Sequence, residues 1–137
     1  MKPPPPTERI VQRQILAMMG RCFPDVLVHH SPNGGHLAGD ASARFRQVGA
    51  LKGDGMKVGW PDLTAVWNHA VAFMEVKRPG YTPSAVKPQQ REIHARLAEM
   101  GFAPAIVTCE QEAFNFLRDR GAPWNGLKLL SMMERAA

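Results

Sequence analysis

The sequence has little of what disulfide-bonded, zinc-binding or membrane proteins require. It contains only two cysteines, Cys22 and Cys109, and neither has a second cysteine nearby. Neither a disulfide framework nor the paired ligand spacing of a zinc site is therefore predicted. No stretch approaches the roughly 18 apolar residues of a membrane span, and the chain starts with prolines rather than the apolar core of a signal sequence. We expect a protein of the reducing cytoplasm with no membrane partner.

Acidic side chains are also in the minority. The chain carries 12 acidic against 17 basic residues, which gives a net charge of +5 and a pI of about 9.7. Many soluble proteins carry such a charge, but the excess favours a polyanionic partner, with nucleic acid preferred over membrane. At 137 residues, with 45% hydrophobic residues, the chain is expected to form one domain with its own core.

A β-hairpin is predicted in the middle of the chain. Residues 63–74 hold two apolar, partly β-branched runs, broken by the polar pair Asn68-His69. If the turn is centred between Asn68 and His69, facing residues have numbers that sum to 137. Asp62 then faces Glu75 on the neighbouring strand, with the Cβ atoms roughly 5 Å apart.

These two acids need a positive charge beside them. Like charges placed directly opposite one another destabilise a hairpin. Lys77 follows Glu75 by two residues and lies on the same face of the strand, whereas Val76 points into the core. Two carboxylates and a lysine at the end of a hairpin form a divalent-metal site with an adjacent cation. Phosphodiester hydrolysis uses such an arrangement.

A helix is predicted before the hairpin, over residues 8–21, after a flexible proline-rich stretch at residues 1–6. Thr7 is its expected N-cap, and its apolar stripe is Val11, Ile15, Met18 and Cys22. Glu8 lies on the side of that stripe, which suggests that the helix lines a cleft. A glutamate in the first turn is equally explained by the helix dipole, which it opposes.

A glycine-rich, basic segment of about thirty residues separates a short strand at 26–28 from the hairpin. It is too long for a simple connector. We expect a helical turn or two over residues 44–51, and otherwise a loop whose cations approach phosphates; a solvated loop without a ligand is the alternative. The candidate nucleic-acid contacts here are Asn33, Arg44, Arg46, Lys52 and Lys57, and further along the chain Arg78, Lys87 and Arg91.

The second half of the chain predicts a crossover unit. A helix over residues 89–100 leads to a strand at 105–107, expected to lie parallel to the second hairpin strand, and a helix over residues 110–120 follows. On the first of these helices the amide of Gln90 points towards the sheet. Residues 122–137 are expected to form a C-terminal extension. Within it, Leu127, Leu130 and Met133 lie at helical spacing, and this tail can cover the core or meet a second subunit.

An aspartate and a Glu-x-Lys on a hairpin flanked by helices match the pattern of the PD-(D/E)xK nucleases. The chain resembles the VRR-NUC family of these nucleases over about residues 7–120. The residues that carry the resemblance are Glu8, Pro32-Asn33-Gly34-Gly35, Gly59-Trp60-Pro61-Asp62-Leu63, Glu75-Val76-Lys77 and Gln90. It departs from the family at Trp60, where a smaller apolar residue is more usual. The resemblance implies an α/β fold with a restriction-endonuclease-like core, a central mixed sheet flanked by helices, within a nuclease domain of residues 7–121.

The resemblance also implies roles for the residues. The ligands that it implies for Mg²⁺ or Mn²⁺ are Asp62, Glu75, the backbone carbonyl of Val76 and, directly or through water, Glu8. Lys77 orients the attacking water or stabilises the charged transition state. Gln90 holds Lys77 or that water.

Two functions of different classes follow. The first is a Mg²⁺-dependent endodeoxyribonuclease; the resemblance implies a stand-alone homodimer that cuts branched DNA such as Holliday junctions, in a bacterial cell or a phage-infected host. The second is a non-catalytic nucleic-acid-binding module, which would be expected to lose one of the three central residues. Outside this set, His29, His30 and His36 lack a partner motif and are expected to be ordinary histidines, and Trp60, Trp67 and Trp124 are expected to pack rather than stack on bases.

Overall fold

The computed structural model describes residues 1–32 and 39–125. Asn33 and His36, and the predicted helical tail with Leu127, Leu130 and Met133, lie outside the described residues. A four-stranded mixed sheet in the order β1-β2-β3-β4 forms the centre. The first three strands are antiparallel neighbours and the last pair is parallel. The strands are β1 Leu27–His30, β2 Leu63–Trp67, β3 Ala70–Val76 and β4 Ala105–Val107.

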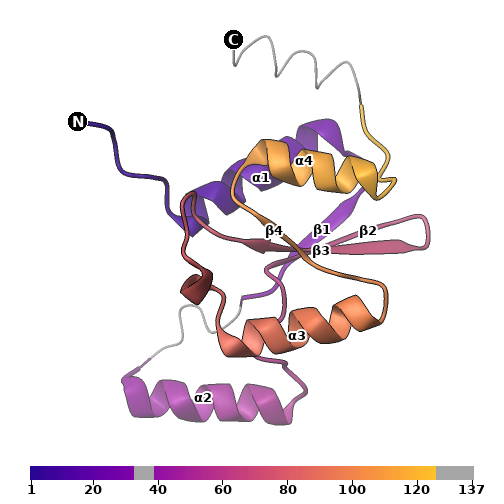
Figure 1. Cartoon of the computed structure of the whole chain (residues 1–137). Helices are drawn as coiled ribbons and strands as arrows, with labels where there is room; N and C mark the ends of the chain where they lie inside the picture. Colours follow the sequence, from indigo (N-terminus) through magenta and orange to yellow (C-terminus); the bar gives the residue numbers. More distant parts are fainter. Residues whose placement is uncertain (33–38, 126–137) are drawn as a thin grey trace.

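Helices cover both faces of this sheet, as Figure 1 shows. On one face lie α1, Glu8–Cys22, and α4, Glu110–Asp119, and on the other lies α3, Pro88–Glu99. The helix α2, Ala41–Gly53, lies beyond α3, and a short 3₁₀ turn, η1, spans Pro83–Ala85. The expected α/β architecture of a mixed sheet flanked by helices is confirmed. In the described part of the chain, no helix is long and apolar enough to span a membrane.

The first helix begins and packs as its sequence predicts. The hydroxyl of Thr7 accepts a hydrogen bond from the backbone N–H of Ile10, an N-cap that satisfies one free donor of the first turn. Its apolar stripe is buried in the larger of two core clusters, together with Leu63 and Met74 from the hairpin and Phe114 from α4. This cluster fixes the helix, and Glu8 at its start, against the sheet.

The hairpin has the predicted register. Leu63 faces Met74 and Trp67 faces Ala70, so the paired numbers sum to 137. Asn68 and His69 form the two-residue turn with φ angles of 24° and 65°. Positive φ at both positions matches the right-handed twist of the strands. The register therefore places residues 62 and 75 next to each other, immediately beyond the last paired residues.

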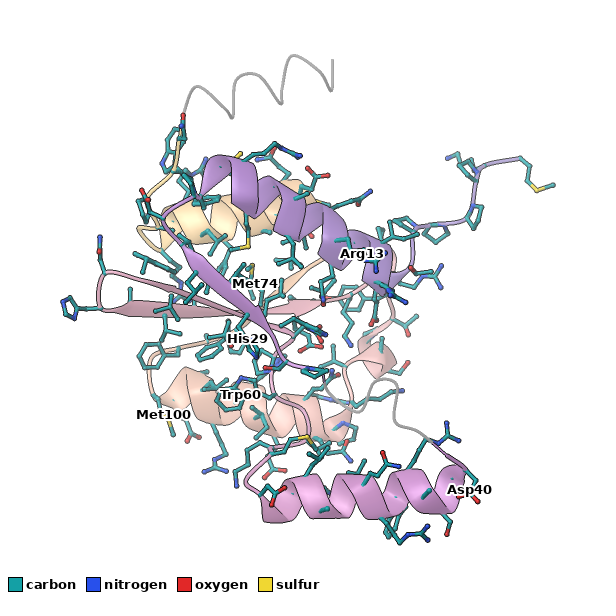
Figure 2. The ribbon with its side chains drawn as sticks, turned by 180° about the vertical axis from the view of Figure 1, so that it is seen from behind. Arg13, His29, Asp40, Trp60, Met74 and Met100 are labelled. Carbon is teal, nitrogen blue, oxygen red and sulfur yellow. The ribbon has the colours of Figure 1, made fainter. Side chains whose placement is uncertain are left out.

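A smaller core cluster lies between the sheet and α3. Phe73, Ile93 and Leu97 form it, and Trp60 packs its ring edge-on against Phe73 with centroids 5.5 Å apart. Seen from behind in Figure 2, Trp60 lies on the α3 side of the sheet. The other two tryptophans also pack: Trp67 is buried in the larger cluster, and Trp124 contacts Phe114. Apolar packing, the expectation for all three, is confirmed.

The segment before the hairpin differs from its prediction. Where a helical turn or two was expected over residues 44–51, α2 spans 13 residues. Asp40 caps it by accepting a hydrogen bond from the N–H of Ala43 at 2.8 Å. None of its residues is buried, and Phe45 is 82% exposed. Because this helix has no buried face, its sequence shows only a weak apolar pattern. A prediction that relies on an apolar face therefore underestimates the length of the helix.

One glycine fixes the approach of the chain to the hairpin. Gly59 has a φ of +91°, and a Cβ built there would lie 2.5 Å from the carbonyl carbon and oxygen of Gln89 at the start of α3. We expect Gly59→Ala to lower the free energy of unfolding by about 2–4 kcal/mol, because it adds both left-handed strain and a backbone overlap. Urea unfolding measures this. The matched control is Gly49→Ala, where the added Cβ meets nothing within 4 Å; equal losses in the two variants would contradict the expectation.

Candidate active site at the hairpin end

Asp62 and Glu75 meet at the end of the hairpin, as the register requires. One carboxylate oxygen of Asp62 accepts a hydrogen bond from the backbone N–H of Val76 at 2.8 Å. Burial and, secondly, the adjacent Glu75 carboxylate raise the pKa of Asp62 to about 7. The Val76 hydrogen bond and the charge of Lys77 act in the opposite direction without cancelling the rise. Asp62 is therefore poised to keep its proton unless a cation compensates its charge.

Glu75 and Lys77 form a buried ion pair beside Asp62. Glu75 is 1% exposed and Lys77 is 5% exposed. The Lys77 Nζ lies 3.5 Å from Glu75 Oε1. Charged side chains are almost never so fully buried unless they are paired, because desolvation of each charge is costly. Glu75 and Lys77 are thus a buried charged pair at the end of the hairpin.

Gln90 links the two charged groups. Its amide Nε2 donates a hydrogen bond to Glu75 Oε1 at 2.7 Å, and its Oε1 accepts one from Lys77 Nζ at 3.4 Å. The same Oε1 accepts a hydrogen bond from the backbone N–H of Lys87 at 2.9 Å, which caps the start of α3. The first turn of α3 is therefore tied to the charged cluster, as the predicted direction of the Gln90 amide required.

Glu8 reaches the cluster from its rim. Its Oε1 lies 3.8 Å from Lys77 Nζ, and its side chain is 50% exposed. The contact places Glu8 beside the charged cluster, in addition to its favourable position in the first turn of α1, but Glu8 is not buried with the apolar stripe. Its position at the start of α1 places a third carboxylate beside the lysine.

The sequence reasoning missed His94. Its Nε2 lies 3.4 Å from Glu75 Oε2, and both atoms are buried without a hydrogen-bond partner in the described part of the chain. One signal was available: His94 follows Gln90 by four residues, so both side chains lie on the same face of α3. The imidazole closes the inner side of the cluster.

The donors fit a hard divalent cation. Two carboxylates meet here, and Glu75 Oε2 has no hydrogen bond among the described residues. No group of three histidine, cysteine, aspartate or glutamate side chains with the geometry of a metal site occurs in residues 1–32 and 39–125. The carboxylate oxygens of Asp62 and Glu75 are of the ligand type that Mg²⁺ prefers, and Mg²⁺ commonly binds through one or two carboxylates and keeps several waters.

The candidate nucleic-acid contacts among the described residues come from several elements. Arg44, Arg46 and Lys52 lie on α2, with Lys57 in the segment that follows it. Near the start of α3, Lys87 is exposed. Two other cations are engaged with the backbone: Arg78 donates to the carbonyl of Pro5, and Arg91 donates to the carbonyl of Val86, each at 3.1 Å.

The described histidines outside the cluster are ordinary, as expected. His29 and His30 are exposed on β1, and the Nδ1 of His30 lies 3.1 Å from the backbone carbonyl of Asp62. Neither joins the carboxylate pair, so nothing in their placement indicates a second catalytic centre.

Comparison with known proteins supports the fold. No protein-family model matches the chain, and no curated protein matches it. Among solved structures, a chain described as a "VRR_NUC domain protein" matches with a TM-score of 0.63 and 21% sequence identity. The match covers 87% of this chain and 89% of that one. The protein therefore has the fold of a VRR_NUC domain protein over nearly its whole length, as the resemblance in its sequence implied.

Proposed function

We propose that the protein is a divalent-metal-dependent endonuclease that hydrolyses phosphodiester bonds of DNA. The observation that supports this most strongly is the meeting of Asp62 and Glu75 at the hairpin end, with the buried Lys77 3.5 Å from Glu75. A fold shared with a VRR_NUC domain protein and a net charge of +5 agree with a DNA substrate.

Asp62 and Glu75 hold Mg²⁺ or Mn²⁺ in this proposal, with the carbonyl of Val76 as a further oxygen ligand and Glu8 directly or through water. When bound, the ion supplies a water of lowered pKa and neutralises charge on the scissile phosphate. The protein keeps Asp62 in place through the Val76 N–H, so its second oxygen can face the ion. Glu75 is oriented by Gln90 in the same way.

Lys77 acts on the reacting groups. Its ammonium orients the attacking water or stabilises the charge that develops on the phosphate oxygens. Hydrolysis forms one phosphorus–oxygen bond from the water and breaks another; the water loses a proton and the leaving oxygen gains one. Gln90 and Glu8, 3.4 Å and 3.8 Å from the lysine nitrogen, restrict its position. A group held before the reaction needs no reorganisation during it.

The substrate and assembly belong to the same proposal. We propose a homodimer that cuts branched DNA such as a four-way junction, acting in the cytoplasm of a bacterial cell or a phage-infected host. Two copies related by two-fold symmetry can cut two strands of one branched substrate, which a single active site cannot do in one encounter.

Cleavage assays on matched DNA structures test this function. The protein is incubated with a four-way junction, a flap and a linear duplex of the same sequence, with Mg²⁺ or with EDTA. We expect cleavage in Mg²⁺ only, faster on the branched substrates, and a mass in solution of twice that of the chain. If DNA is bound under every condition but never cut, the protein is instead a non-catalytic binding module that keeps the nuclease fold.

A further inference from the structure

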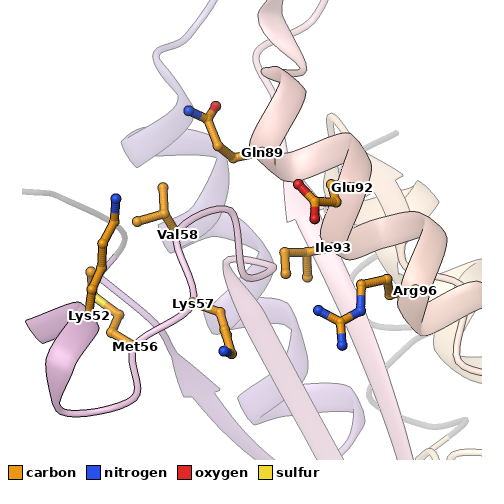
Figure 3. A pocket seen from close by; sticks show the side chains of 8 residues that line it. All are labelled: Lys52, Met56, Lys57, Val58, Gln89, Glu92, Ile93 and Arg96. Atoms are coloured by element: carbon orange, nitrogen blue, oxygen red, sulfur yellow. The ribbon is translucent and has the colours of Figure 1, made fainter.

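A pocket outside the catalytic cluster lies between α3 and the segment that precedes the hairpin. Figure 3 shows a pocket between the segment that follows α2 and the first three turns of α3. Its volume is about 330 Å³. Lys52 and Lys57 line one wall, and Glu92 and Arg96 line the wall formed by α3, with Ile93 between the walls. The catalytic proposal uses none of the α3 residues in this pocket.

The charge of the pocket favours an anion. Three cations and one carboxylate line it, and none of these four side chains makes an ion pair with another described residue. Lys57 and Arg96, from opposite walls, extend to the same end of the pocket in Figure 3. Cations from two separate elements that converge without an acidic partner leave a net positive hollow. Glu92 reduces this charge but leaves it positive.

A backbone contact holds the loop against α3 beside the pocket. Gly59 follows directly after the lining residues of the loop, and its Cα approaches the backbone of Gln89 so closely that no Cβ fits. Ile93 is 9% exposed and anchors α3 to the sheet through the smaller core cluster. The approach of Gly59 to Gln89 and the packing of Ile93 hold the loop and α3 in place beside the pocket, which favours a preformed binding site.

The pocket and the catalytic cluster share one helix. Gln90 and His94 face the cluster, whereas Gln89, Glu92 and Arg96 face the pocket. A DNA strand that contacts both must cross α3. A phosphate bound in the pocket would then be a different one from the phosphate that is cut.

We propose that this pocket binds a backbone phosphate of the DNA, away from the scissile one, through Lys57 and Arg96 with Lys52 beside them. This rests on the proposed nuclease function and extends it to how the substrate is positioned. Arg96 is a residue that no sequence motif indicated. A guanidinium presents a fork of donors to phosphate oxygens, and an ammonium adds a compact charge. Contacts of this kind fix the register of a nucleic acid without reading its bases.

Binding measurements on a cleavage-deficient protein test the pocket. In an Asp62→Asn background, affinity for a four-way junction and for linear duplex is measured across a range of salt concentrations. Lys57→Gln with Arg96→Gln is compared with Arg118→Gln and Arg120→Gln, which remove the same charge from the last turn and the C-cap of α4, on the opposite face of the sheet. We expect the Lys57→Gln/Arg96→Gln variant to bind about tenfold more weakly or worse and to have a salt slope reduced by about 0.9, the value for one lost phosphate contact. The α4 pair should change affinity less than about twofold.

The outcomes are distinct. Equal effects from the two pairs, with urea unfolding unchanged in both, overturn the pocket proposal. If wild-type protein cuts DNA and the Lys57→Gln/Arg96→Gln variant binds DNA normally, only the pocket proposal fails. If wild-type protein neither binds nor cuts DNA, the nuclease proposal itself fails. Calorimetric titration with orthophosphate and with a deoxynucleoside monophosphate distinguishes a site for free phosphates from a site for the DNA backbone. Saturable binding of either below about 1 mM, lost in the pocket pair, indicates a site for free phosphates and overturns the backbone assignment.

Discussion

Asp62→Asn is expected to abolish Mg²⁺-dependent cleavage and yet to make the metal-free protein more stable at pH 8. Asparagine keeps the oxygen that accepts the hydrogen bond from Val76 but removes the charge that holds the cation. Loss of a metal ligand removes several kcal/mol of transition-state stabilisation, so we expect cleavage to fall on the order of 10³-fold or more. Gel assays with a labelled junction measure this.

The stability gain follows from the pKa of Asp62. That pKa is raised to about 7 in the folded protein, above its value in the unfolded chain, chiefly because the carboxyl is buried and secondly because Glu75 is beside it. The folded state therefore holds the proton more tightly, and its stability falls as the pH rises from about 4 to about 7 and is level above that. The loss is on the order of a few kcal/mol at most, since one pH unit corresponds to about 1.4 kcal/mol.

Urea unfolding in EDTA at pH 4.5, 6 and 8 measures this pH dependence. The asparagine variant should lack most of the decline, whereas Asp25→Asn, at an exposed position, should keep it. A decline of the same size in wild-type protein and in the Asp62 variant would show that another group causes it.

Lys77→Met is expected to lower stability and activity together, in contrast to the change at Asp62. Without the ammonium, the carboxylate of Glu75 is left almost fully buried and without its cation. Breaking a buried ion pair from one side costs about 3–5 kcal/mol, and cleavage should fall about 10²- to 10³-fold with the loss of one transition-state donor.

Mg²⁺ should restore part of the lost stability of this variant, because the ion replaces the missing positive charge. Thermal unfolding with EDTA and with Mg²⁺ measures both effects, with the exposed Lys2→Met as the control. A methionine variant as stable as wild-type protein in EDTA, with normal cleavage, would mean that Lys77 is neither a structural nor a reactive partner of Glu75.

The centre of the fold could be predicted because local rules determine it. A two-residue turn and the alternation of side chains fix the hairpin register, and from that register the meeting of Asp62 and Glu75 follows directly. The helical period placed Gln90 towards the sheet in the same way, and the structure joins it to Glu75. The same helical period places His94 on the face of Gln90, but no charge pattern in the sequence indicates that it is a site residue.

Features that depend on long-range placement could not be predicted. The helix α2 has no buried face, so no apolar periodicity in the sequence indicates its length. Arg96 acquires its environment only because Gly59 brings the chain against the backbone of Gln89, some thirty positions further along the sequence. Glu8 needed the packing of α1 before a contact with Lys77 could be distinguished from an ordinary helix-dipole effect.

Calorimetric titration of Mn²⁺ into the protein at pH 8 tests most directly whether residues 62 and 75 share a cation. Asp62→Asn and Glu75→Gln are titrated beside wild-type protein, and Asp25→Asn serves as the exposed control. Saturable binding to wild-type and control protein, lost in each of the two hairpin variants, is the predicted result. Binding that survives in both hairpin variants, or that is missing from wild-type protein, would contradict a shared metal site at the end of this hairpin.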